Sequence, residues 1–88
     1  MTLKFPNHSR SYDSGLQRVR FSAYDGVFEV PFFVEVGALA AMASPPASTE
    51  AGYLYAFDNA RDAIQDVDRR AYKRGRKTMY VLTSSDFN

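Results

Sequence analysis

Residues 17–34 read QRVRFSAYDGVFEVPFFV, and this stretch decides the fold because apolar residues alternate on both sides of the dipeptide Asp25-Gly26. A two-residue type I′ turn requires such a dipeptide, since both of its central residues have positive φ. A turn at this position pairs Tyr24 with Val27, Ala23 with Phe28 and Phe21 with Val30. The stretch therefore predicts a β-hairpin of fixed register, because a slip of one residue would turn its apolar side chains to the other face.

The two faces of the predicted hairpin differ in character. The face expected to be buried carries Val19, Phe21, Ala23, Phe28, Val30 and Phe32. The opposite face is mixed and carries Arg18, Arg20, Ser22, Tyr24, Val27, Glu29, Pro31 and Phe33. If no other part of the chain covers it, this mixed face is a candidate protein interface. The residues of that candidate interface are Tyr24, Val27, Pro31 and Phe33.

Shorter elements are expected on either side of the hairpin. Thr2–Phe5 is expected to form a short strand before it. Pro31 has no N–H, so within the hairpin it should sit at a bulge or with its nitrogen toward a sheet edge. After the hairpin, 35–43 is rich in good helix formers, and the sequence Ser44-Pro45-Pro46 should end that helix.

The longest predicted element is a second helix that begins after Ser48 or Thr49, either of which can cap it. Its apolar residues recur at steps of four and three, as one face of a helix requires. They are Tyr53, Phe57, Ala60, Ile64, Val67 and Ala71. Gly75 is expected to end this helix. The residues 77–83 then read as a strand with apolar side chains on both faces, so it is expected to be central or covered on both sides.

The resulting order is β-β-β-α-α-β over a chain of 88 residues, a length typical of one domain. Because the strands cluster before the helices, we predict one α+β domain over residues 1–88. Its sheet is expected to be antiparallel, with two helices packed on one face.

Composition excludes several kinds of chemistry. The chain has no cysteine, which rules out disulfides, a cysteine nucleophile and thiolate metal sites. Its one histidine, His8, lies among polar loop residues, and no glycine-rich phosphate-binding string occurs. Asp58, Asp62 and Asp66 share a helix face that is either a carboxylate metal site or, opposite the apolar stripe, a solvated surface. We therefore predict no catalytic residue, no metal site and no cofactor.

Charge is distributed unevenly along the chain. Residues 69–77 carry a net charge of +6, whereas residues 1–68 carry −4, although the whole chain has a net charge of only +1. Cations at the end of a helix complement its dipole, and the same cations could bind a nucleic acid, another polyanion or an acidic protein. The candidate polyanion-binding residues are Arg69, Arg70, Tyr72, Lys73, Arg74, Arg76 and Lys77, with Tyr72 available to stack on a base.

Several short segments resemble a known family in the same order along the chain. They are Phe5-Pro6-Asn7, Ser11-Tyr12-Asp13, Val19-Arg20-Phe21, Tyr80-Val81-Leu82-Thr83 and Asp86-Phe87. The chain thereby resembles the domain-of-unknown-function family numbered 1488, small single-domain bacterial proteins, mostly from proteobacteria. Many members have Trp in place of Tyr12 and a Ser-x-Glu-Ala-Leu cap where this chain has residues 35–39. The resemblance implies an α+β fold and no activity, cofactor or catalytic residue.

These observations favour a non-enzymatic interaction or regulatory module that binds an unidentified protein or a second copy of itself. The alternative is nucleic-acid binding through residues 69–77, and a small enzyme is a third hypothesis. The longest apolar runs are far short of the roughly 20 residues that a membrane span needs, and residues 1–13 lack the apolar core of a signal peptide. A cytoplasmic location without membrane contact is therefore expected.

Overall fold

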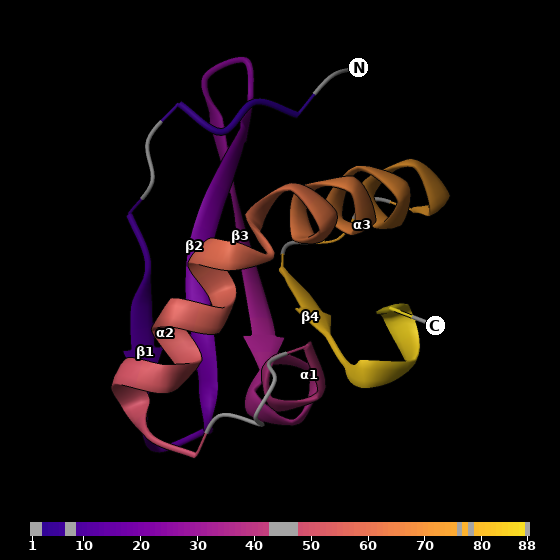
Figure 1. Cartoon of the computed structure of the whole chain (residues 1–88). Helices are drawn as coiled ribbons and strands as arrows, with labels where there is room; N and C mark the ends of the chain where they lie inside the picture. Colours follow the sequence, from indigo (N-terminus) through magenta and orange to yellow (C-terminus); the bar gives the residue numbers. More distant parts are fainter. Residues whose placement is uncertain (1–2, 7–8, 43–47, 76, 78, 88) are drawn as a thin grey trace.

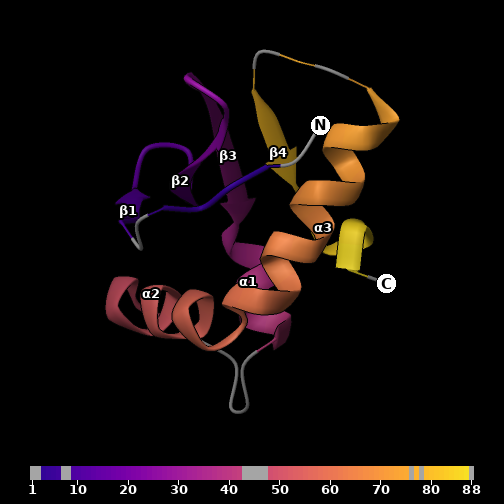
Figure 2. The same ribbon diagram turned by 90° about the horizontal axis from the view of Figure 1, so that it is seen from above.

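The computed structural model describes residues 3–6, 9–42, 48–75, 77 and 79–87. Within these residues a four-stranded sheet packs against three α-helices that lie on one of its faces (Figures 1 and 2). The elements are β1 (Ser11–Asp13), β2 (Arg18–Asp25), β3 (Phe28–Glu35), α1 (Val36–Met42), α2 (Glu50–Asn59), α3 (Arg61–Arg74), β4 (Tyr80–Leu82) and the 3-10 helix η1 (Ser84–Phe87). The predicted α+β class is confirmed.

The predicted hairpin forms, but its register differs from the prediction. Asp25 pairs with Phe28, so the turn consists of Gly26 and Val27. Gly26 has φ +63°, as the first central residue of a type II′ turn requires. The pairing thereby moves by two residues, which preserves the predicted inward face. Phe28 is the exception, because at the hairpin tip it lies beyond the core and is 73% exposed.

The first strand lies elsewhere than predicted. In the described part of 2–5, Lys4 makes only an isolated bridge to Tyr24. The edge strand is instead Ser11–Asp13, which pairs antiparallel with β2. The sequence pattern of this strand is weak, because the strand has three residues and only one large side chain, Tyr12. The Tyr12 ring stacks on Tyr53 of α2.

The long helix predicted after Thr49 is two helices. Thr49 caps α2 as predicted, since its hydroxyl accepts a hydrogen bond from the Gly52 amide at 3.1 Å. The helix breaks at Ala60, whose φ and ψ are −102° and 14°. A straight helix over residues 50–74 would be about 38 Å long, whereas an eight-residue strand spans about 27 Å. The break lets both halves of the apolar stripe pack on the sheet, with Phe57 and Ile64 fully buried.

The last strand corrects two further predictions. β4 pairs parallel with β3, so the sheet is mixed, its order is β1-β2-β3-β4, and β4 is an edge strand. Parallel pairing arises because the three helices carry the chain back to the end of the sheet where β3 begins (Figure 1). β4 is covered on one face only: Tyr80 and Leu82 are buried, whereas Val81 is 36% exposed.

Other local predictions have mixed outcomes. The first helix spans Val36–Met42, and Gly75 directly follows α3, both close to prediction. Pro31 sits opposite Ser22 in regular register, not at a bulge. The segment 44–46 lies outside the described residues.

Candidate functional site

The exposed basic residues at the end of α3 line a hollow against η1. Its volume is about 480 Å³, and its lining joins Val67, Arg70, Lys73 and Arg74 of α3 to Ser85 and Asp86 of η1. Arg70, Lys73 and Arg74 follow Val67 at helical spacings that keep their side chains on one side of α3. Figure 1 shows α3 and η1 on either side of the outer edge of β4.

A second hollow of about 260 Å³ continues from the first. It is lined by Ala71, Arg74, Gly75, Lys77, Tyr80, Val81, Leu82 and Asp86. Arg74 and Asp86 line both hollows, so the two hollows adjoin each other between α3, the edge of β4 and η1. We call the two hollows together the α3–η1 groove.

The α3–η1 groove carries more positive than negative charge. Four cations line it: Arg70, Lys73, Arg74 and Lys77. None of these four takes part in an ion pair among the residues that the structure describes. Asp86 is the one acidic residue among the described residues that line the groove, and its Oδ2 accepts a hydrogen bond from the Thr83 amide at 2.8 Å. The groove therefore offers several cationic donors to an anionic ligand.

Two other predicted polyanion-binding residues, Arg69 and Tyr72, do not line this groove. Arg69 lies 3.5 Å from the Asp66 carboxylate and 5.1 Å above the Phe5 ring. Tyr72 is partly buried: its hydroxyl donates to Asp25 and its ring packs edge-on against Tyr80. Tyr72 is thus held between the hairpin and β4. Arg76 lies outside the described residues.

The mixed face of the sheet is not covered by any helix among the described residues. Of its four candidate interface residues, Tyr24, Pro31 and Phe33 are only partly exposed, and Val27 is in the turn at 89% exposure. The Arg18 guanidinium stacks 3.9 Å from the Phe33 ring centre, so a charge interrupts the apolar surface. The four residues therefore form no continuous apolar patch.

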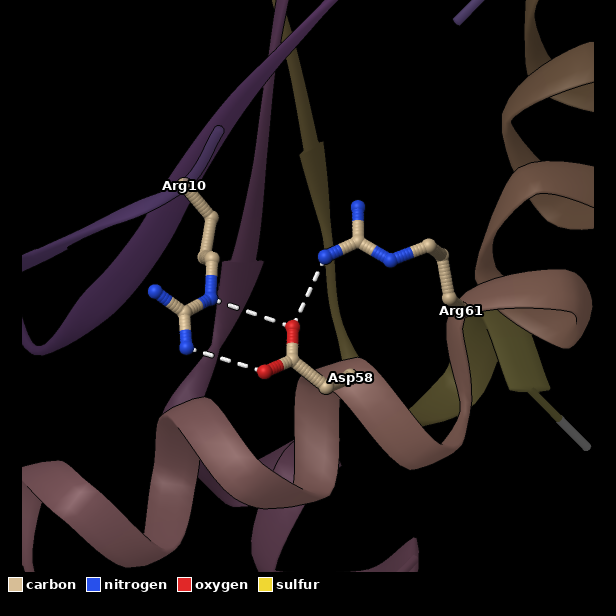
Figure 3. Close-up of polar contacts among 3 residues, drawn as sticks. All are labelled: Arg10, Asp58 and Arg61. Carbon is tan, nitrogen blue, oxygen red and sulfur yellow. Dashed lines mark hydrogen bonds and ion pairs between the residues drawn. The ribbon is translucent and has the colours of Figure 1, made fainter. Parts of the chain in front are cut away.

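A second polar cluster joins the N-terminal part of the chain to the break between α2 and α3 (Figure 3). Arg10 donates from Nε and Nη2 to the two carboxylate oxygens of Asp58, at 3.1 and 2.9 Å, and Arg61 Nη2 lies 2.7 Å from Oδ1. The hydrogen bonds from Arg10, with those from Arg61, lower the pKa of the Asp58 carboxyl. Asp58 and Arg61 are three residues apart, and their ion pair spans the break between α2 and α3. Because Asp58 is satisfied by two arginines, the cluster acts as a tether between segments.

The aspartates that suggested a metal site are not gathered. Asp62 and Asp66 lie exposed on α3, beyond the break that separates them from Asp58. In the described part of the chain no three potential ligand side chains come together. His8 lies outside the described residues. The solvated-face interpretation therefore suits Asp62 and Asp66.

Asp68 is the residue that sequence reasoning missed. It is fully buried, and neither carboxylate oxygen has a hydrogen-bond partner among the residues that the structure describes. Burial raises the pKa of this carboxyl to about 8, against a smaller lowering by the nearby Arg69 charge. A signal was present, because Asp68 follows the core residue Ile64 by four positions and therefore lies on the same side of α3.

Comparison with known proteins places the chain in a family. The model of the family described as "Protein of unknown function (DUF1488)" matches residues 3–83. The chain belongs to this DUF1488 family. The resemblance seen in its short segments is thereby confirmed, and the DUF1488 description assigns no activity to the α3–η1 groove. No curated protein and no solved structure matches this DUF1488 member. In the described residues, no helix has both the length and the apolar character to cross a bilayer.

Proposed function

We propose that this protein is a non-enzymatic interaction module that binds an acidic segment of a partner protein in the α3–η1 groove. The observation that carries the proposal is the set of groove cations without an ion-pair partner in the described chain: Arg70, Lys73, Arg74 and Lys77. Carboxylates are matched ligands for such donors, and charge-assisted hydrogen bonds are stronger than neutral ones. A cytoplasmic location and a regulatory role stay predictions from the sequence.

The distribution of charged side chains along α3 favours a protein segment over a nucleic acid as the ligand. The cations are confined to one end of α3, and the same helix exposes Asp62 and Asp66 nearer its start. A nucleic acid extending past the groove would meet these carboxylates and lose the phosphate contacts on which its affinity depends. Tyr72 is held by Asp25 and Tyr80, and Tyr80 itself is buried, so the described residues of the groove offer no exposed aromatic ring for a single strand to stack on.

The test measures binding of a fluorescein-labelled octapeptide of alternating glutamate and valine by fluorescence anisotropy. We expect binding that weakens as salt rises, because salt screens the contributing charges. Arg74→Glu should weaken binding about tenfold, which corresponds to about 1.4 kcal/mol. Arg20→Glu is the matched control, since it makes the same charge change at an exposed position on β2 that does not line the groove. Its affinity should stay within about twofold of wild type.

Three results would overturn the proposal. The first is the absence of peptide binding at low ionic strength. The second is an equal loss in Arg74→Glu and Arg20→Glu, which would indicate attraction to net charge without a site. The third is tighter binding of a labelled single-stranded oligonucleotide than of the peptide, which would support the nucleic-acid alternative. Far-UV circular dichroism of each variant establishes that it is folded.

A further inference from the structure

We infer that the acidic segment binds as an added β-strand along the outer edge of β4. This inference rests on the proposed function and names the geometry of the same site. Edge strands present unpaired backbone N–H and carbonyl groups, and peptide ligands use such edges in β-augmentation. The question is whether β4 turns these groups toward the α3–η1 groove.

The direction of the backbone groups follows from one pair of hydrogen bonds. Lys4 and Tyr24 exchange both of their backbone hydrogen bonds at 2.8 Å, so the N–H and carbonyl of Tyr24 point away from β3. Tyr24 is paired with Glu29, whose backbone groups must then point away from β2. Successive residues of a strand alternate in this respect, so the backbone groups of Pro31 and Phe33 also point toward β4.

The same alternation fixes the outer edge of β4. Phe33 lies opposite Val81 in the parallel ladder, and a residue in that position bonds to the two neighbours of its partner, Tyr80 and Leu82. The N–H and carbonyl of Val81 therefore point away from β3, toward the free edge. No strand among the described residues pairs with β4 on that side. Pro31, which has no N–H to offer β4, lies just before the β3 residues that pair with β4.

The hollow at this edge suits a short extended segment of acidic character. It is bounded by Tyr80, Val81 and Leu82 on one side and by Arg74 and Lys77 on the other. A strand added about 4.8 Å from β4 would place alternate side chains on the helix-covered face, where Arg74 lies, and on the open face beside Val81. The first set would be acidic because it faces Arg74, and the second would be apolar because its neighbour on the open face is the exposed Val81. The chemistry thus fits a partner segment in which acidic and apolar residues alternate.

The decisive experiment uses the wild-type protein with two isomers of the alternating glutamate–valine octapeptide. In one isomer the glutamate amides are N-methylated, and in the other the valine amides. In a strand, the N–H groups of one set face β4 and those of the other set face solvent. We therefore expect one isomer to lose at least tenfold in affinity while the other stays within about threefold of the unmodified peptide. Equal affinities for the two isomers would overturn the added strand and leave groove binding by carboxylates intact.

A second experiment probes the protein side of the same contact. Val81→Pro removes the N–H that points to the free edge and leaves every N–H that donates to β3 in place. Edge strands tolerate proline at such a position. It should weaken the unmodified peptide at least tenfold, whereas Val81→Thr keeps the donor and should bind as wild type does. In wild type, hydrogen exchange of the Val81 amide should slow when the peptide binds. An unchanged hydrogen-exchange rate of the Val81 amide in the saturated complex would overturn the inference. A wild-type dimer that Val81→Pro dissociates would also overturn it, because a second copy of the chain would then occupy the edge of β4.

Discussion

Replacing Asp68 by asparagine should make this protein more stable in alkali and leave it nearly unchanged in acid. Asp68 is fully buried with no hydrogen-bond partner in the described part of the chain, and its pKa is raised by burial to about 8 from an ordinary value of 3.8. The folded state therefore binds a proton that the unfolded state releases between these two pH values. Under that condition the free energy of unfolding falls as pH rises.

The size of this effect follows from the shift in pKa. Each unit of difference corresponds to 1.36 kcal/mol, so a shift of about four units removes on the order of 5 kcal/mol between pH 4 and pH 8. Such a loss is a large part of the 5–15 kcal/mol that stabilises typical domains. Asp68→Asn abolishes the titration. Its stability should therefore be close to that of wild type near pH 4, where the buried carboxyl is protonated, and should exceed it by several kcal/mol above pH 8.

The assay is urea unfolding followed by far-UV circular dichroism at intervals from pH 4 to pH 9. Asp66→Asn is the matched control, because the Asp66 side chain is 71% exposed on the same helix. The difference between Asp68→Asn and wild type should grow with pH, whereas that for Asp66→Asn should stay nearly constant. If the Asp68→Asn and wild-type curves run parallel over this range, Asp68 is not the buried acid described above.

Three further predictions concern the core, the turn and the tether. Phe57→Ala should lower the free energy of unfolding by about 3–5 kcal/mol, measured by urea unfolding, because it empties a fully buried site between α2 and the sheet. Gly26→Ala should cost about 1–2 kcal/mol since φ is +63° there, whereas Gly37→Ala in α1, with open space around it, should be neutral or stabilising. A double-mutant cycle of Arg10→Ala with Asp58→Ala should give a coupling of about 0.5–1 kcal/mol. That coupling should be complete above the ordinary aspartate pKa of 3.8 and lost as pH falls toward the lowered value.

Part of the candidate site could be predicted from the sequence. The cluster of cations in residues 69–77 was evident from charge alone, and Arg70, Lys73, Arg74 and Lys77 do line the α3–η1 groove. Sequence could not show that η1 lies opposite them, nor that Tyr72 is held by Asp25. These contacts join residues far apart in the chain, so no local pattern encodes them.

The sequence by itself determined the features that depend on neighbouring residues. The inward face of the hairpin, the apolar stripe of the helices and the Thr49 cap all follow from spacing along the chain. The predicted hairpin register was wrong by one turn position, because both arrangements bury nearly the same side chains and give Gly26 a positive φ. Only the pairing of Asp25 with Phe28 distinguishes them.

Only the tertiary structure decided the break at Ala60, the parallel pairing of β4 and the burial of Asp68. The finite length of the strands, about 27 Å, requires the helical segment to bend if both of its halves are to pack on the sheet. The path of the bent helices returns the chain to the end where β3 begins, which makes β4 parallel. The resulting packing of α3 encloses a carboxyl group that spacing alone would place only at the margin of the core. Each of these outcomes depends on the distance between packed elements, and that distance is a property of the assembled fold.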